Sequence, residues 1–356
     1  ARTSGFSIWA AVALSLIYGA AMYALSPWIL PALGANEGTY GFCRQYMFWA
    51  VGIGSVPTVL NAVFAHLVRA EGYSRQASFG MILGAALNII LDPVFISGLN
   101  MQIAGAALAT MVSNLAATMY FVIFILRLGD RVTLTLNPRL FSVSDRIPSE
   151  VFLVGLPSTL MSLMSTASNI TLNRLMSSYS NEAIAGVGIA KRIDLLTFAV
   201  ATGMSQGVVP LIGYNYSARN YARMRQAIRT TFAVSLTAAS VCTILLFTLA
   251  GPMVSAFIND PLTVEYGEVF QRIICIAGPC IPVTLIIITI FQSVGKKYPP
   301  MILSLLRKGG LDIPFMFIMN ACLGVTGIVW ATPIADFSAM IIAILVFLRE
   351  WRTLPV

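Results

Sequence analysis

Two polar residues interrupt the apolar stretch LGAALNIILDPVFI at residues 83–96. Asn88 and Asp92 are four residues apart, so a helix places them on one face, about 6 Å apart along its axis. If this helix lies in lipid, an ionised Asp near its centre costs roughly 2.5–3.5 kcal/mol. Such a cost indicates a binding residue, and the alternative is an Asp that only caps or bends the helix near the outer interface.

Thr110 and Pro93 supply further oxygen atoms near this pair. The turn between the two apolar stretches centres near residue 99, and Asn88 and Thr110 each lie 11 residues from it. Because consecutive spans run antiparallel, the two side chains are predicted at the same depth. Pro93 has no N–H to donate to the carbonyl of Ile89. A carboxylate, an amide oxygen, a hydroxyl and a free carbonyl suit a hard monovalent cation such as Na⁺, or a shared proton.

The second half of the chain carries another set of polar residues in apolar stretches. They are candidates to line a substrate cavity: Asn169, Asn173, Lys191, Arg192, Asp194, Arg307 and Asp312. Lys191 and Asp194 have i, i+3 spacing, and Lys308 and Asp312 have i, i+4 spacing. Each pair is therefore predicted to neutralise itself on its own helix.

Three intramembrane charges have no partner at helical spacing. Arg192 and Arg307 are left over once the two local pairs are formed. Asp336 is an unpaired acid in the last apolar stretch. These charges are predicted either to face a cleft and contact substrate or to have a structural role, and the sequence leaves both alternatives open.

The composition identifies the environment of these residues. Of 356 residues, 58% are hydrophobic and 10% are charged, with a mean hydropathy of +0.83, whereas soluble domains carry about 25% charged residues. The five Cys are scattered and the lone histidine, His66, lies near a helix end, so neither a disulfide framework nor a zinc site is indicated. No cofactor motif is present. The chain is predicted to be an all-α membrane protein.

Apolar runs separated by turn residues predict ten transmembrane helices, since about 20 apolar residues cross a bilayer. The predicted spans are 5–30, 42–68, 77–97, 102–127, 148–176, 183–213, 226–257, 267–294, 299–321 and 326–350. Of the 22 Lys and Arg residues, 15 fall on the side that holds both chain ends, three on the other side and four within spans. The positive-inside rule therefore places both chain ends in the cytoplasm of a plasma-membrane protein. This bias and anionic lipid account for the net charge of +8, so no nucleic-acid partner is expected.

The chain repeats itself with a shift of 222–225 residues. Three matches in register are SPWILPALG (26–34) with GPMVSAFIN (251–259), GIGSVPTVL (52–60) with AGPCIPVTL (277–285), and IAGAALATMVSNL (103–115) with VTGIVWATPIADF (325–337). The third pairs Thr110 with Thr332 and Asn114 with Asp336. Spans one to four thus repeat as spans seven to ten, and the even displacement makes the repeats parallel.

The repeat predicts two lobes of unequal content. Residues 1–128 form an N-terminal lobe of four helices, 129–147 a cytoplasmic linker and 148–356 a C-terminal lobe of six helices. Residues 148–213 have no counterpart at the front of the chain. The repeat therefore predicts two further helices, of about 75 residues, before Ala1, and a twelve-helix, pseudo-symmetric parent protein.

Several stretches resemble the MATE (multidrug and toxic-compound extrusion) family, in its prokaryotic multidrug branch. They are RAEGYSRQASFGMILGAALNIILDPVFI, GAALATMVSN, GMSQGVVPLIGYNYSARNYARMRQAIR and FQSVGKKYPPMILSLLRKGGLDIPFMFI. The resemblance begins at the family's third helix and implies antiport of lipophilic or cationic drugs against H⁺ or Na⁺ by a monomer. It implies that Asn88, Asp92 and Thr110 form the cation-coupling site, with an Asp of the family's first helix that would precede Ala1. The acidic second-lobe site of another branch is not matched.

Two other functions compete with drug antiport. A flippase for lipid-linked oligosaccharides has a related fold, but it should have a more basic cavity for a pyrophosphate than Lys191, Arg192, Arg307 and Lys308 provide. An intramembrane enzyme would need clustered acids or a His with a nearby Asp, and one His with isolated acids argues against it. ATP-driven export is excluded because the chain has no GxxxxGK[ST] loop.

Overall fold

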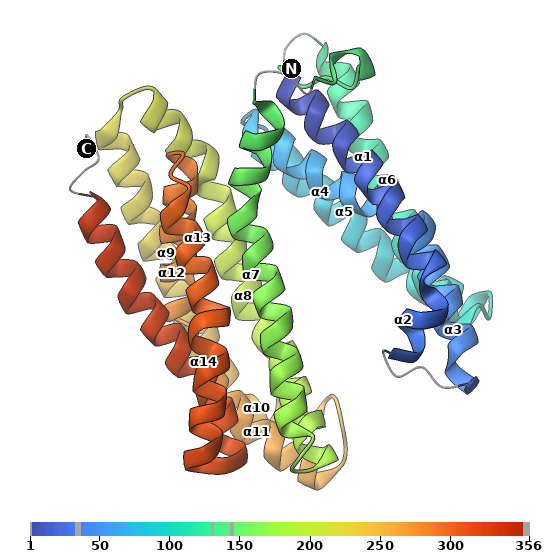
Figure 1. The fold of residues 1–356 in the computed structure, drawn as a ribbon, viewed down its shortest axis with the longest axis vertical. Coiled ribbons are helices and arrows are strands. Elements are labelled where there is room, and N and C mark those ends of the chain that lie inside the picture. The colour runs from blue at the N-terminus through green and yellow to red at the C-terminus, as the bar shows by residue number, and fades with distance from the viewer. Residues whose placement is uncertain (1, 33–36, 130–131, 143–145, 352–356) are drawn as a thin grey trace. The chain divides into compact units, whose positions relative to one another are not determined.

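The fold is known from a computed structural model, which describes residues 2–32, 37–129, 132–142 and 146–351 (Figure 1). Over these ranges all regular elements are helices. The chain divides into two compact units, residues 1–151 and 152–356.

Several helices of the first unit are broken or contain a π-helical turn within the described residues. Its elements are α1 (Arg2–Ala24), α2 (Ser26–Ala32), α3 (Glu37–Met47), η1 (Phe48–Ile53), α4 (Ser55–Ala70), α5 (Ser74–Pro93), η2 (Val94–Gly98), α6 (Gln102–Leu128) and the short η4 (Pro138–Leu140). Helix α5 packs against both α4 and α6, and α1 packs against α4.

Small residues on α5 allow α6 to approach closely. A Cβ atom at Gly80 would collide with the ring of Phe121, and one at Gly84 would lie 3.2 Å from the Cβ of Ala117. Phe121 is fully buried in the core of the unit together with Phe64. This close α5–α6 hairpin brings the predicted ion site together, because its residues lie on these two helices.

The second unit is also helical over its described residues. Its elements are α7 (Ile147–Met176, whose first turn belongs to the first unit), α8 (Asn181–Ser217), α9 (Tyr221–Thr248), α10 (Ala250–Ser255), α11 (Pro261–Cys275), α12 (Cys280–Ser293), α13 (Tyr298–Leu305), η5 (Leu306–Asp312) and α14 (Ile313–Trp351). Helix α8 is central and packs against α9, α11 and α12, while α14 packs against α11 and α12.

Local signals start three helices of the second unit. Ser180, Asn220 and Asp260 precede α8, α9 and α11, and each side chain accepts the backbone N–H three residues further on, at 3.0, 3.2 and 2.9 Å. Such caps satisfy donors that have no partner within the helix. Each of the three helices therefore begins where a capping residue occurs in the sequence.

The last predicted spans, 299–321 and 326–350, appear as one run of helix over Tyr298–Trp351. Gly324 interrupts this run with φ = 63°, a backbone conformation that favours glycine. A Cβ at Gly327 would collide with the carbonyl oxygen of Met319, so the chain folds back at this point. Without the break, 54 residues would extend about 80 Å, far more than the hydrocarbon core of about 30 Å. The break thus separates two segments, where the sequence predicts separate spans.

Breaks occur at repeat-related positions in the two halves of the chain. The bends between α3–η1 and α4 and between α11 and α12 are 45° and 46°. Within the predicted spans 5–30 and 226–257 a new helix begins, at Ser26 in the first and at Ala250 in the second. Pro27 and Pro252 lie in the first turns of α2 and α10, where proline is tolerated.

Among the residues that the structure describes, seven helices are individually long and apolar enough to cross a membrane, and each bent pair adds one more candidate. The all-helical membrane fold is confirmed, and the count of ten crossings stays a prediction. The predicted linker, 129–147, includes η4, and helix α7 begins at its last residue. Residues 130–131 and 143–145 of the linker lie outside the described residues.

Candidate functional site

The structure brings Asn88, Asp92 and Thr110 together in the first unit. The Asn88 amide nitrogen (Nδ2) donates to Asp92 Oδ1 at 3.3 Å and to Thr110 Oγ1 at 3.4 Å. The Thr110 hydroxyl donates to the carbonyl of Ala106 at 3.0 Å. All three side chains are partly exposed. One amide therefore connects a carboxylate on its own helix to a hydroxyl on the neighbouring helix.

Two further amides extend this polar network into the first unit. Asn114 Nδ2 donates to the backbone carbonyl of Thr110 at 2.9 Å, and Asn61 Nδ2 donates to Asn114 Oδ1 at 2.8 Å. Asn61 Oδ1 is buried and has no hydrogen-bond partner in the described ranges. Sequence reasoning missed Asn61, although an amide inside the predicted span 42–68 is itself a signal.

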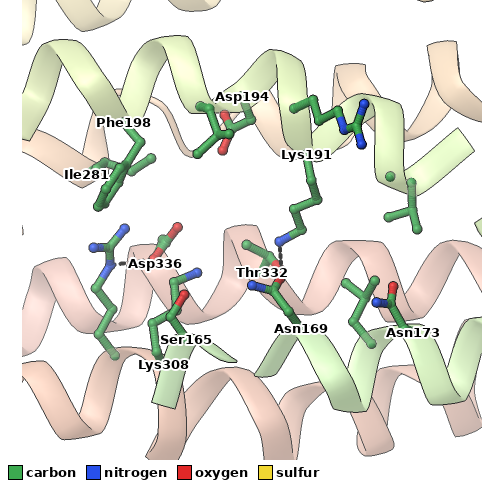
Figure 2. Close-up of a pocket in the computed structure, with 16 residues that line it drawn as sticks. Ser165, Asn169, Asn173, Lys191, Asp194, Phe198, Ile281, Lys308, Thr332 and Asp336 are labelled. Carbon is green, nitrogen blue, oxygen red and sulfur yellow. Dashed lines mark hydrogen bonds and ion pairs between the residues drawn. The ribbon is translucent and has the colours of Figure 1, made fainter. Parts of the chain in front are cut away.

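The second unit contains a cavity of about 350 Å³ lined by α7, α8, α12, η5 and α14 (Figure 2). Asn169 and Asn173 face it from α7, and Lys191, Arg192 and Asp194 line it from α8. Of the predicted cavity residues, these five and Arg307 belong to the lining. Lys308 and Asp336, which were considered for a cavity or cleft from the sequence, also line it. The remaining lining residues are Ser165, Leu172, Val187, Gly188, Leu195, Phe198, Ile281 and Thr332. Asp312 is not part of the lining and is fully buried.

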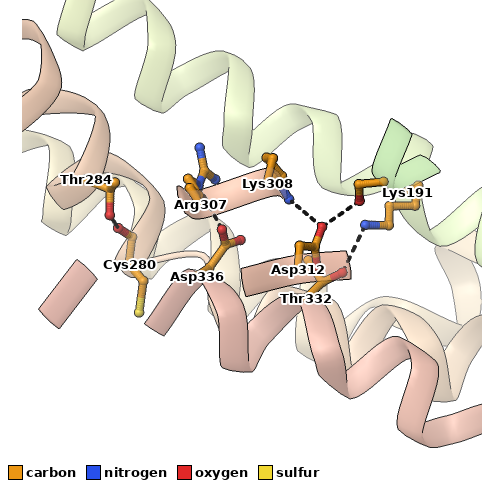
Figure 3. A network of polar contacts seen from close by, with 9 residues as sticks. Lys191, Cys280, Thr284, Arg307, Lys308, Asp312, Thr332 and Asp336 are labelled. Carbon is orange, nitrogen blue, oxygen red and sulfur yellow. Dashed lines mark hydrogen bonds and ion pairs between the residues drawn. The ribbon is translucent and has the colours of Figure 1, made fainter. Parts of the chain in front are cut away.

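Arg307 and Asp336 form a buried ion pair between η5 and α14 (Figure 3). Arg307 Nε lies 2.8 Å from Asp336 Oδ1, and the two side chains are only 2% and 4% exposed. The expectations that Arg307 is left over and that Asp336 is unpaired are therefore wrong. The pair joins residues 29 positions apart, so helical spacing within one segment does not reveal it.

Lys308 and Asp312 form the predicted local pair at 3.5 Å, so this prediction is confirmed. Asp312 Oδ2 also accepts a 2.6 Å hydrogen bond from the hydroxyl of Ser168 on α7. Asp312 Oδ1 is buried and has no hydrogen-bond partner among the described side chains and backbone. This carboxylate therefore links η5 to α7, in addition to neutralising Lys308.

Lys191 and Asp194 do not pair, which corrects the second local prediction. Lys191 Nζ instead donates to the hydroxyl of Thr332 on α14 at 3.3 Å (Figure 3). Asp194 Oδ1 is buried, and within the described part of the chain it has no hydrogen-bond partner. The lysine side chain is long enough to reach across the cavity. Its partner lies 141 residues further along the chain, so helical spacing cannot predict this contact.

Proteins of known sequence resemble this chain over nearly its whole length. The multidrug export protein MepA of Staphylococcus aureus is 32% identical over 344 residues, which are 96% of this chain and 75% of that protein. MepA of Staphylococcus saprophyticus is 30% identical over 344 residues, again 96% of this chain and 75% of that protein. The chain spans about three quarters of the length of both relatives.

Solved structures share the fold. An outward-facing multidrug resistance MATE family transporter of the MOP superfamily has a TM-score of 0.92 and 23% identity, over all of this chain and 79% of that one. The Vibrio cholerae MATE transporter VcmN in its bent form has a TM-score of 0.85 and 19% identity, over 99% of this chain and 79% of that one. At these identities the similarity concerns the fold alone.

A family model described as MatE matches residues 157–318, which lie in the second unit. The MepA relatives extend the similarity to 96% of the chain at 32% identity. The predicted family is therefore confirmed, and since its members are transporters, the chain is not an enzyme. The chain belongs to the MatE family of multidrug and toxic-compound extrusion transporters.

Proposed function

We propose that the chain is a secondary active multidrug efflux transporter, which exports lipophilic or cationic compounds in exchange for H⁺ or Na⁺. The MepA relatives, which are 32% identical to this chain, are named as multidrug export proteins. The observation that carries the coupling proposal is the amide of Asn88, which bonds to both Asp92 and Thr110. It places a carboxylate and two neutral polar groups at one point on two apolar helices.

Asp92 is the central group of the proposed ion site. Its carboxylate keeps an oxygen, Oδ2, for which the described residues provide no hydrogen bond, and Asn88 likewise keeps its amide oxygen. These oxygens and the hydroxyl of Thr110 can surround a monovalent cation, or the carboxylate can take a proton. In both cases the bound ion neutralises Asp92, and this lowers the cost of keeping the side chain in an apolar environment.

The substrate is proposed to bind in the cavity of the second unit, which contains Asn169, Asn173, Lys191 and Asp194. Its volume of about 350 Å³ lies within the range of small-molecule sites, roughly 300–1,000 Å³. Leu172, Val187, Phe198 and Ile281 supply apolar walls. In this account the segments 1–128 and 148–356 are the two lobes of a plasma-membrane monomer with cytoplasmic chain ends.

A lipid-linked oligosaccharide flippase is the alternative function, and the charges of the cavity argue against it. Of the four basic residues expected to bind a pyrophosphate, Arg307 and Lys308 already pair with Asp336 and Asp312. Only Lys191 and Arg192 then remain for an anion of high charge. The name of the MepA relatives also favours drug export.

The test is drug efflux from liposomes that contain the purified protein, driven separately by a pH gradient or by a Na⁺ gradient. One gradient should drive efflux and thereby identify the ion. Asp92→Asn keeps the size of the side chain but removes the charge, so it should abolish this efflux. Asp260→Asn is the matched control, since Asp260 is exposed and Asn also caps helices well. Efflux by Asp92→Asn at the wild-type rate would refute the assignment of the site.

A further inference from the structure

A second cavity lies in the first unit, between α5 and α6. It has a volume of about 570 Å³, and the residues that line it are Arg75, Gln76, Ser78, Phe79, Ile82 and Tyr120. Arg75 is the one charged residue among the described residues of this lining. A cationic drug would meet a like charge here, so this cavity does not suit the cationic substrates of the proposed function.

The polar side chains of this cavity have no partners in the part of the chain that the structure describes. The guanidinium of Arg75 forms no ion pair there, and the side chains of Gln76 and Ser78 and the hydroxyl of Tyr120 form no hydrogen bond. The hydroxyl of Ser113, by contrast, donates to the carbonyl four residues earlier on its own helix. Convergent polar groups in a partly apolar cavity are typical of a binding site, and a cation among neutral donors suits an anionic ligand.

The apolar residues of the cavity continue along one face of α5. Arg75, Phe79 and Ile82 follow one another at spacings of four and three residues, so they lie on the same face. Phe79 is 53% exposed and Ile82 is 63% exposed, and Ile89, two turns further on this face, is 73% exposed. From Arg75 to Ile89 the face extends about 21 Å. A soluble anion would leave these apolar side chains uncovered, whereas the acyl chain of a lipid would cover them.

The cavity lies at the level of a membrane surface. Arg75 is the second residue of the candidate membrane span Ser74–Gly98, so its side chain lies where phospholipid headgroups lie. The rings of Phe79 and Tyr120 have their centres 5.3 Å apart, and tyrosine is enriched at the interface between membrane and water. Arg127 follows Tyr120 by seven residues on the same face of α6. This helix therefore adds a second cation near the same surface.

We propose that this cavity binds an anionic phospholipid of the surrounding membrane. The phosphate would accept hydrogen bonds from Arg75, whose guanidinium can donate two parallel bonds to phosphate oxygens. Gln76 and Ser78 can donate to other oxygens of the headgroup, and one acyl chain would lie along Phe79 and Ile82. This inference goes beyond the proposed function, because the lipid site lies outside the ion site and outside the substrate cavity.

The test compares two phospholipids that have the same acyl chains. Phosphatidylglycerol is anionic, and phosphatidylcholine has a headgroup without net charge. The purified full chain in a non-ionic detergent is titrated with each lipid, and native mass spectrometry gives the dissociation constant of the first lipid that binds. The wild-type protein should bind phosphatidylglycerol more tightly than phosphatidylcholine.

Arg75→Gln removes the charge and keeps a side chain that can donate a hydrogen bond. It should weaken the binding of phosphatidylglycerol by about tenfold, the effect of one lost charge-assisted hydrogen bond, and leave phosphatidylcholine binding unchanged. Arg75→Lys should keep part of the preference, because lysine retains the charge without the two parallel bonds. Arg174→Gln is the matched control, since Arg174 is exposed on α7 and lies outside this cavity. It should bind both lipids as the wild type does.

A second variant keeps the inference testable if Arg75→Gln does not fold. Ile82 is exposed, so in Ile82→Trp the indole ring can occupy the cavity without disturbing the core, and the binding of phosphatidylglycerol should weaken. Equal binding of the two lipids by the wild type would overturn the inference. An equal loss in Arg75→Gln and Arg174→Gln would do so too, because it would indicate a general attraction between the protein and anionic lipid.

A soluble competitor separates a lipid site from a site for free phosphate. Glycerol 3-phosphate at millimolar concentration should leave phosphatidylglycerol bound, because it has no acyl chain to cover Phe79 and Ile82. Displacement of the lipid by this compound would overturn the inference. All of these experiments measure binding without transport, so their failure would leave the proposed function standing. Failure of ion-driven drug efflux would refute the proposed function and leave the lipid site standing.

Discussion

Removing only one partner of the buried pair of Arg307 and Asp336 should destabilise the second unit by several kcal/mol. The two side chains are 2% and 4% exposed and their closest atoms are 2.8 Å apart. Removing one partner leaves the other charge buried without compensation, which costs about 3–5 kcal/mol. We therefore expect Arg307→Met and Asp336→Leu each to lower the free energy of unfolding by about 3–5 kcal/mol.

The double variant separates a lost pair from lost packing. With Arg307→Met and Asp336→Leu combined, no charge is stranded, and replacing a buried pair by apolar residues is often neutral or stabilising by about 1–4 kcal/mol. The free energy of unfolding should therefore return to within about 1 kcal/mol of the wild-type value, or exceed it. Equilibrium unfolding in mixed micelles, followed by circular dichroism, measures all four states of the cycle.

An exposed pair provides the matched control for this cycle. Glu268 and Arg272 lie 2.7 Å apart on α11, with side chains 33% and 46% exposed, and such pairs contribute about 0–1 kcal/mol. Their coupling energy should be correspondingly small. Additive effects of the two substitutions at Arg307 and Asp336 would refute the interpretation of this contact as a coupled, buried ion pair.

Two further predictions concern the loops. In a background without native cysteines, a Cys introduced at Gln102 or Asp260 should react with impermeant reagents in intact cells. A Cys introduced at Ser74 or Lys297 should not react. The reverse pattern would contradict the orientation predicted from the basic residues. A hydrogen bond from the side-chain hydroxyl of Thr263, together with one from its backbone N–H, lowers the pKa of Asp260 below its ordinary value. The cap therefore contributes fully above the pKa of the unfolded chain, and its contribution is lost as the pH falls through the lower folded pKa. The amide NMR signal of Thr263 should titrate in that acidic range, and a midpoint at or above the ordinary Asp pKa would contradict the capping role.

The first polar cluster could be located from the sequence because its geometry is local. Asn88 and Asp92 are one turn apart, and Thr110 follows across a single short turn. Counting residues from that turn is enough to place Thr110 at the depth of Asn88, and the structure joins the three through the Asn88 amide. The starts of α8 and α9 can be predicted from the sequence in a similar way, since Ser180 and Asn220 are capping residues that precede apolar runs.

The charge pairs of the second unit could not be predicted because they depend on packing between distant segments. Arg307 and Asp336 come together across the break at Gly324, and the π-helical turn η5 changes the face on which Arg307 lies. The helical spacing of Lys191 and Asp194 predicted a pair on one helix. The lysine reaches Thr332 instead, a choice that depends on where α14 lies and not on α8 alone.

The central claim is that Asp92 couples ion movement to drug movement, and the most direct measurement is the ion flux that a drug gradient drives. Liposomes containing the protein enclose a pH-sensitive or Na⁺-sensitive dye, and a drug gradient is imposed with no ion gradient. The wild-type protein and Asp260→Asn should move H⁺ or Na⁺ in the direction opposite to the drug, whereas Asp92→Asn should move neither ion. An equal ion flux through Asp92→Asn, or drug transport by the wild type without any ion flux, would contradict the account.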